Sequence, residues 1–124
     1  WGIGLHEYQI SGDWEFVPND MSQFTINAVH QDQVVEKPVE AKLLATSDFC
    51  QNAGLVYDGF AITLQAHPEF SIDYEKDLIE VRKGETFPNQ LSDEAIEELK
   101  LESAKTDSLA VGKWLGQFLV DNRK

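Results

Sequence analysis

The 124-residue chain has little of several features that would place it in a specialised class of protein. It contains a single cysteine, Cys50, so it cannot form an internal disulfide, and we predict a reducing compartment, the cytoplasm, as its location. No apolar run approaches the roughly 18 residues that a membrane-spanning helix needs, and no basic segment leads into an apolar one at the start. These absences argue against secretion and membrane insertion.

Basic residues are scarce as well. The chain has 10 Lys and Arg against 22 Asp and Glu, which gives a formal net charge of −12. Such a surface repels the phosphates of nucleic acids and anionic membranes, so we expect neither as a partner. The three histidines lie at positions 6, 30 and 67, without a His-x-x-x-His or Cys-x-x-Cys pair. We therefore expect no metal and no other cofactor.

The rest of the composition is that of an ordinary globular domain. Hydrophobic residues make up 42% of the chain and charged residues 26%, and the length suits one domain with one core. The first residue is Trp1 instead of Met, so we expect the written sequence to begin inside a longer protein. A processed N-terminus is the alternative.

The hydrophobic pattern changes along the chain from a strand period to a helix period. Residues 1–10, 24–29 and 42–47 are typical of strands, and Asp58-Gly59 favours a tight turn between strands 54–57 and 60–66. Residues 71–83 and 107–122 carry apolar side chains at helical spacing. Strands followed by helices predict an α/β domain with an antiparallel extension.

Four details of the helical half can be predicted. Gly84 is a suitable stop for the first helix, and Ser92 is a suitable N-cap for the second. Between them, residues 85–90 are predicted to form a surface loop. The last helix is predicted to present one apolar side, made of Leu109, Trp114, Leu115, Phe118 and Leu119.

The most informative stretch is His67-Pro68-Glu69-Phe70, which directly follows the apolar run 61–66. Strand ends of α/β sheets are where such proteins place their chemistry. An imidazole and a carboxylate two residues apart can form part of a nucleophile-activating triad, in which the acid orients the imidazole and stabilises its charged form. A hydrogen-bonded structural histidine is the alternative interpretation.

A second polar cluster, His30-Gln31-Asp32-Gln33, follows the predicted strand 24–29. We interpret it as a rim that recognises a small polar ligand. The alternative is a loop whose turn residues only satisfy one another. His6 and Glu7 could line the same rim, although a surface pair is the simpler interpretation.

Cys50 does not fit the role of the missing nucleophile. A cysteine on a strained nucleophile elbow needs small flanking residues, and Cys50 lies between Phe49 and Gln51. We therefore interpret Cys50 as a structural or incidental thiol.

Taken together, these stretches resemble the class I, triad-type glutamine amidotransferase domain, and most closely the stand-alone relatives of the GMP synthase amidotransferase domain. Leu64-Gln65-Ala66-His67-Pro68-Glu69-Phe70 matches the family's Gln-x-His-Pro-Glu block, Val29-His30-Gln31-Asp32-Gln33-Val34 matches an upstream block, and residues 44–54 resemble the segment that joins them. Order and spacing agree over residues 1–83. The remaining residues match in outline, as terminal helices.

The resemblance implies a flavodoxin-like α/β fold, of which residues 1–124 would form the C-terminal part of a single domain. His67 would be the base that activates a cysteine, and Glu69 the carboxylate that orients His67. His30, Gln31 and Asp32 would bind the substrate. The thiolate would attack the side-chain amide of glutamine, forming a γ-glutamyl thioester and releasing ammonia before water releases glutamate.

One feature of the family is absent: no Gly-x-Cys-x-Gly elbow occurs in the 124 residues. We therefore expect the nucleophile in an N-terminal half of the same domain, and we expect this chain alone to be inactive. The expected partners are glutamine or a γ-glutamyl substrate, that N-terminal half, and a synthetase or acceptor domain. The alternatives are a γ-glutamyl peptidase or hydrolase of the same fold and a non-catalytic binding or regulatory homologue.

Overall fold

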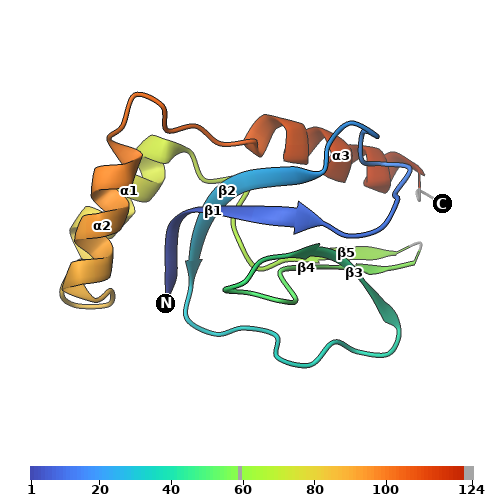
Figure 1. Cartoon of the computed structure of the whole chain (residues 1–124), viewed down its shortest axis with the longest axis horizontal. Helices are drawn as coiled ribbons and strands as arrows, with labels where there is room; N and C mark the ends of the chain where they lie inside the picture. The colour runs from blue at the N-terminus through green and yellow to red at the C-terminus, as the bar shows by residue number, and fades with distance from the viewer. Residues whose placement is uncertain (59, 122–124) are drawn as a thin grey trace.

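The computed structural model describes residues 1–58 and 60–121 (Figure 1). These residues form an antiparallel sheet followed by three helices. The strands are β1 (Gly2–Ile10), β2 (Gln23–His30), β3 (Ala41–Thr46), β4 (Gly54–Tyr57) and β5 (Ala61–Leu64), and the helices are α1 (Ile72–Arg82), α2 (Asn89–Leu99) and α3 (Ser108–Asp121).

The sheet has the order β2-β1-β3-β4-β5, and its four ladders are antiparallel. β1 and β2 pair along almost their whole length, from Gly2 opposite His30 to Gln9 opposite Gln23. β1 and β3 share only two residue pairs at the end of β1, so the two parts of the sheet diverge beyond that point (Figure 1). The predicted hairpin of β4 and β5 is confirmed, although Gly59 of its turn lies outside the described residues.

The chain returns from β5 to the opposite edge of the sheet. The residues that follow β5 cross to the outer edge of β2, where His67 forms an antiparallel bridge with Asn27. This crossing places the segment after β5 beside a strand that lies about forty residues earlier in the sequence. The segment then leads into α1.

Two apolar clusters hold the helices against the sheet. α1 and α2 lie side by side and pack with β1 through a cluster that includes Ile3, Ile79 and Ile96. α3 packs through Trp114 and Phe118 against a larger cluster that includes aromatic side chains of β1 and β2. Among the described helices, none has the length and apolar character needed to cross a membrane.

The helix boundaries confirm most of the predictions. The hydroxyl of Ser71 accepts a 3.1 Å hydrogen bond from the N–H of Tyr74 and caps α1. Gly84, just after α1, has a φ of 82°, a conformation that glycine adopts at little cost. The predicted last helix agrees with α3, except that Asn122 lies outside the described residues.

The prediction that Ser92 caps the second helix is wrong. α2 begins at Asn89 with Pro88 in the N-cap position, because proline suits the start of a helix, where an N–H would lack a partner. Ser92 lies one turn inside the helix, fully buried, and its hydroxyl donates a 2.7 Å hydrogen bond to the carbonyl of Pro88. Residues 85–90 are also more than a surface loop, since Phe87 is buried in the cluster with α1 and α2.

The apolar side of the last helix was only partly predicted. Trp114 and Phe118 are buried as expected, together with Val111. Leu109 and Leu119 are 75% and 68% exposed instead, because the buried side of α3 is centred on Val111 and Phe118. Helical spacing identified the element, but the cluster beneath it decided which residues face inward.

Candidate active site

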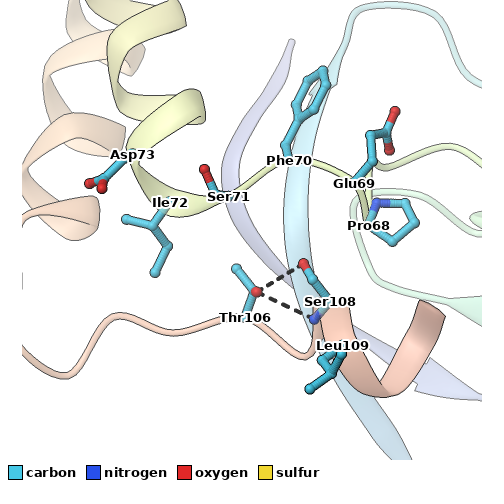
Figure 2. A pocket seen from close by; sticks show the side chains of 9 residues that line it. All are labelled: Pro68, Glu69, Phe70, Ser71, Ile72, Asp73, Thr106, Ser108 and Leu109. Carbon is cyan, nitrogen blue, oxygen red and sulfur yellow. Dashed lines mark hydrogen bonds between the residues drawn. The ribbon is translucent and has the colours of Figure 1, made fainter. Parts of the chain in front are cut away.

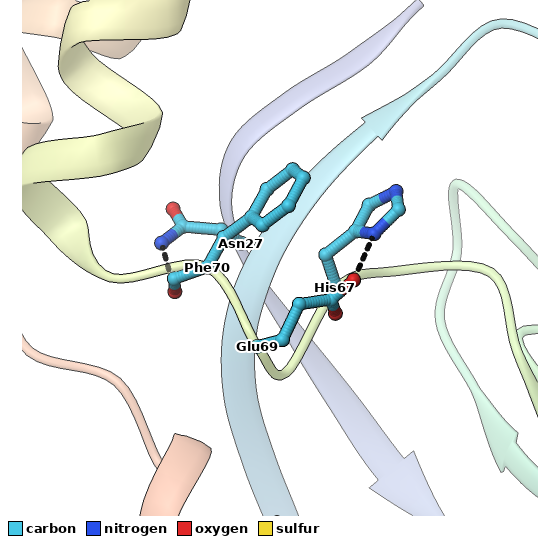
Figure 3. A network of polar contacts seen from close by, with 4 residues as sticks. All are labelled: Asn27, His67, Glu69 and Phe70. Carbon is cyan, nitrogen blue, oxygen red and sulfur yellow. Dashed lines mark hydrogen bonds and ion pairs between the residues drawn. The ribbon is translucent and has the colours of Figure 1, made fainter.

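His67 and Glu69 form a pair at the point where the chain crosses β2. The main-chain N–H of His67 donates a 2.8 Å hydrogen bond to the carbonyl of Asn27, and its Nδ1 lies 3.0 Å from Oε2 of Glu69 (Figure 3). The side chains are 35% and 63% exposed, so the pair is open to solvent. The sequence motif therefore forms a hydrogen-bonded imidazole–carboxylate pair.

The charge on Glu69 determines which nitrogen of His67 carries the proton. Burial raises the pKa of the Glu69 carboxyl, but the hydrogen bond from His67, a main-chain hydrogen bond and the attraction of His67 outweigh it, so the pKa is lowered. An ionised carboxylate can only accept hydrogen bonds, so Nδ1 of His67 is the donor. In the neutral ring this leaves Nε2 unprotonated and able to accept a proton.

One aromatic stack and two hydrogen bonds of an asparagine amide hold the turn that carries this pair. The ring of Phe70 stacks on the imidazole of His67, with centroids 4.3 Å apart and planes within 6°. Nδ2 of Asn27 reaches the carbonyls of Phe70 and Ser71 at 3.2 and 3.4 Å (Figure 3). Sequence reasoning missed Asn27; its signal was a polar residue inside the apolar run of β2.

His30, the first residue of the second predicted cluster, bonds to the main chain of that cluster. Its Nδ1 donates to the carbonyl of Asp32 at 3.1 Å, and burial lowers its pKa. That hydrogen bond raises the pKa by a smaller amount, and the charges of the N-terminus and, least of all, of His67 lower it further. The imidazoles of His30 and His67 are thus within electrostatic reach of each other. Nε2 of His30 is buried and has no hydrogen-bond partner among the described residues.

Gln31 and Asp32 project from the end of β2 into solvent. Both are exposed, and they follow His30 at the beginning of an irregular segment that continues to β3. His30 and its two neighbours thus lie at the end of β2, the strand that His67 bridges at Asn27. No contact between Gln31 or Asp32 and His67 is present in the described residues.

His6 lies near His30, whereas Glu7 points to solvent. The rings of His6 and His30 lie 5.4 and 6.0 Å from the ring of Phe49, and both approach the position of a Cβ on Gly2 at 3.4 Å. Burial and the charge of His30 lower the pKa of His6. Glu7 is exposed, as the interpretation of a surface pair requires, whereas His6 is half-buried.

Cys50 is unsuited to nucleophilic chemistry in this structure. Its side chain is fully buried in the cluster that also contains Tyr8 and Leu44, and burial raises its pKa, with a smaller lowering effect of the Asn52 main chain. A buried thiol with a raised pKa has little reactive thiolate at neutral pH. This burial agrees with the interpretation of Cys50 as a structural or incidental thiol.

A hollow of about 420 Å³ lies next to Glu69, between the N-terminal ends of α1 and α3 (Figure 2). Thr106 Oγ1 and the hydroxyl of Ser108 are 2.9 Å apart on its α3 side. Its lining includes Glu69 but neither His67 nor His30, so the hollow lies beside the pair and does not contain it. Among the described residues, no three His, Cys, Asp or Glu side chains gather in a way that could hold a metal ion.

Comparisons with known proteins find similarity to glutamine amidotransferases. A curated glutamine amidotransferase-like protein of Schizosaccharomyces pombe is 34% identical over 97 residues, which are 77% of this chain and 38% of that protein. The crystal structure of a glutamine amidotransferase from Thermotoga maritima matches with a TM-score of 0.73 at 24% identity, over 95% of this chain and 50% of that one. No protein-family model matches.

The chain spans half or less of the length of the two proteins it matches. The structural likeness extends over 95% of this chain. The α/β architecture predicted from the sequence is confirmed. The chain has the fold of a class I glutamine amidotransferase-like domain.

Proposed function

We propose that this chain belongs to an enzyme that hydrolyses the side-chain amide of glutamine, with His67 as the general base and Glu69 as the carboxylate that orients it. The observation that supports this best is the 3.0 Å contact between Nδ1 of His67 and Glu69, which leaves Nε2 free for a proton. An imidazole held in this way is the activating half of a cysteine, histidine and carboxylate triad.

The proposed reaction begins at a cysteine outside residues 1–124, in the N-terminal half of the same domain. Nε2 of His67 takes the thiol proton, and the thiolate adds to the amide carbon of glutamine. The imidazolium then gives its proton to the departing nitrogen, so ammonia leaves and a γ-glutamyl thioester remains. Water, deprotonated by the same imidazole, hydrolyses the thioester to glutamate and restores the thiol.

We assign substrate binding to His30, Gln31 and Asp32. The exposed carboxylate of Asp32 suits the α-ammonium group of glutamine, and the amide of Gln31 can donate to its α-carboxylate. The lowered pKa of His30 keeps this imidazole neutral at physiological pH, so it adds no positive charge beside the ammonium group.

The partners in this proposal are glutamine, the N-terminal half of the domain, and a synthetase or acceptor domain that uses the ammonia, in the cytoplasm. Hydrolysis of another γ-glutamyl bond by the same three groups is the alternative activity. A binding or regulatory role without catalysis is the alternative from another class. The experiment below separates these three possibilities.

The test measures ammonia and glutamate release by the complete protein, with glutamine and a γ-glutamyl peptide as alternative substrates. We expect His67→Ala to lower kcat by about 10²- to 10⁴-fold, the usual contribution of a positioned base. We expect a smaller loss for Glu69→Gln, because the carboxylate orients the base and does not react. Glu80→Gln, an exposed carboxylate on α1, is the matched control.

Three results would contradict the proposal. A wild-type rate for His67→Ala would remove the base from the mechanism. Preference for the γ-glutamyl peptide over glutamine would favour the alternative activity. A complete protein without a Gly-x-Cys-x-Gly elbow and without either activity would favour the non-catalytic role.

A further inference from the structure

We infer that the side-chain amides of Gln65 and Asn52 form a clamp on the main chain of Val34, which positions the substrate-binding loop relative to the base. The substrate-binding loop is residues 30–34, and the base segment is residues 65–70. The consequence for substrate rests on the proposed function, whereas the clamp itself rests on hydrogen bonds.

Both main-chain groups of Val34 are bound by side chains. Its N–H donates to Oε1 of Gln65 at 3.1 Å, and its carbonyl accepts from Nδ2 of Asn52 at 2.9 Å. Gln65 directly follows β5, and Asn52 lies just before β4. A single residue of the loop is therefore tied to two other segments of the chain.

The two amides have opposite roles, which their partners determine. A main-chain N–H can only donate, so Gln65 must present its oxygen to Val34. A carbonyl can only accept, so Asn52 must present its nitrogen. The clamp therefore requires an acceptor at position 65 and a donor at position 52.

In the described part of the chain, the other side-chain hydrogen bonds of the segment between β2 and β3 lie near its two ends. The ring of His30 binds the carbonyl of Asp32 at the start of the loop, and Nζ of Lys37 donates to the carbonyl of Ala41 at its far end. Val35, immediately after the clamp, is 91% exposed and adds no packing. Hydrogen bonds therefore decide where the end of the substrate-binding loop lies.

The clamp connects this loop to the segment that carries the base. The main-chain N–H of Gln65 donates to the carbonyl of Ala53 at 2.8 Å, and two residues later the N–H of His67 donates to Asn27. Gln65 is thus held in place by its own main chain while its side chain holds Val34. Loss of the clamp would let the substrate-binding residues move while the pair of His67 and Glu69 stays intact.

A positioning role of this kind predicts a separation of kinetic parameters. Without the clamp, glutamine loses part of its binding in both the ground state and the transition state, so KM rises while kcat changes little. Loss of one hydrogen bond to an uncharged partner corresponds to roughly a 3- to 10-fold change. Gln65 and Asn52 are therefore positioning residues and not catalytic ones.

The test uses two isosteric variants of the complete protein. Both add one negative charge, but only one of them is expected to raise KM. Gln65→Glu keeps an acceptor for the N–H of Val34, so we expect a wild-type KM. Asn52→Asp replaces the donor by a carboxylate that faces a carbonyl, so we expect KM to rise roughly 3- to 10-fold or more, as for Gln65→Ala. Gln51→Glu, an exposed neighbour of Asn52, controls for the added charge.

Amide hydrogen exchange at Val34 tests the clamp without any need for activity. We expect slow exchange in the wild type and in Gln65→Glu, and roughly 3- to 10-fold faster exchange in Gln65→Ala. Equal exchange at Val34 in the wild type and Gln65→Ala would overturn the clamp. Faster exchange with an unchanged KM would overturn its link to substrate. If the wild type has no glutaminase activity, the proposed function fails, and the exchange data alone decide whether the clamp exists.

Discussion

The main-chain N–H of His67 donates a 2.8 Å hydrogen bond to the carbonyl of Asn27, which binds the proposed base to the outer edge of β2. The side chain of the same asparagine then reaches the carbonyls of Phe70 and Ser71. One buried residue therefore fixes both ends of the turn that carries His67 and Glu69, and it also holds the beginning of α1.

Replacement of Asn27 should weaken the fold and loosen this turn. Asn27→Ala removes the donor to two carbonyls in a fully buried position, so we expect a loss of about 1–3 kcal/mol in the free energy of unfolding. Asn27→Asp should cost more, because a carboxylate would face the same carbonyls. Urea denaturation measures both. Gln23→Ala, exposed on the same strand, is the control, and equal midpoints for all variants would contradict the assigned role.

The stacking of Phe70 on His67 should contribute to turnover. Phe70→Leu removes the ring that lies parallel to the imidazole at 4.3 Å and leaves the contact with Glu69 as the remaining restraint on the imidazole. A stacked aromatic pair contributes about 0.5–1.5 kcal/mol, so we expect kcat for glutamine to fall by roughly 2- to 10-fold with little change in KM. Phe60→Leu, which alters an exposed ring away from the turn, should leave kcat unchanged. A normal kcat in Phe70→Leu would exclude a positioning role.

Glu75 should make stability depend on pH. This carboxyl is fully buried on α1, where burial raises its pKa to about 7 although the N–H of Gly4 donates to it at 2.8 Å. Because the folded protein holds the proton more tightly than the unfolded chain, this group stabilises most below its ordinary pKa of 4.5. That contribution is lost as pH rises through 7, at up to about 1.4 kcal/mol per pH unit.

Glu75→Gln tests this dependence. The amide oxygen can still accept from Gly4, but the side chain no longer titrates. We expect unfolding experiments between pH 4.5 and 8 to show a smaller loss of stability with rising pH in this variant than in the wild type. Glu80→Gln, exposed on the same helix, should retain the wild-type slope. An unchanged slope in Glu75→Gln would show that another group titrates.

Two glycine substitutions should have opposite effects on stability. Gly4 has a φ of 85°, and a Cβ there would lie 3.1 Å from the Cβ of Ala95, so Gly4→Ala should destabilise by about 1–2 kcal/mol or more. Gly112 lies in α3, and a Cβ there meets nothing within 4 Å, so Gly112→Ala should stabilise by about 0.5–1 kcal/mol. Thermal unfolding of both variants measures the difference. Shifts of the unfolding temperature in the same direction for both variants would contradict the expected opposite effects.

The prediction from sequence was most successful where the signal is local. Alternation and helical spacing indicate which residues of a segment face apolar surroundings, so all five strands and all three helices of the described residues were expected. The pair of His67 and Glu69 is local as well, because two residues of one turn must lie close together. Ser92 was misplaced because both a capping and a buried serine satisfy local hydrogen bonds, and only the burial of α2 distinguishes them.

The sequence by itself determined the helices and strands and the imidazole–carboxylate pair, since each follows from residues that are neighbours in the chain. Only the tertiary structure decided that His30 lies within electrostatic reach of His67, that Asn27 holds the turn, and that Gln65 and Asn52 bind Val34. These contacts join residues 18 to 44 positions apart. Periodicity shows that a side is buried but not against which segment, and here the crossing of the chain from β5 to the edge of β2 made that choice.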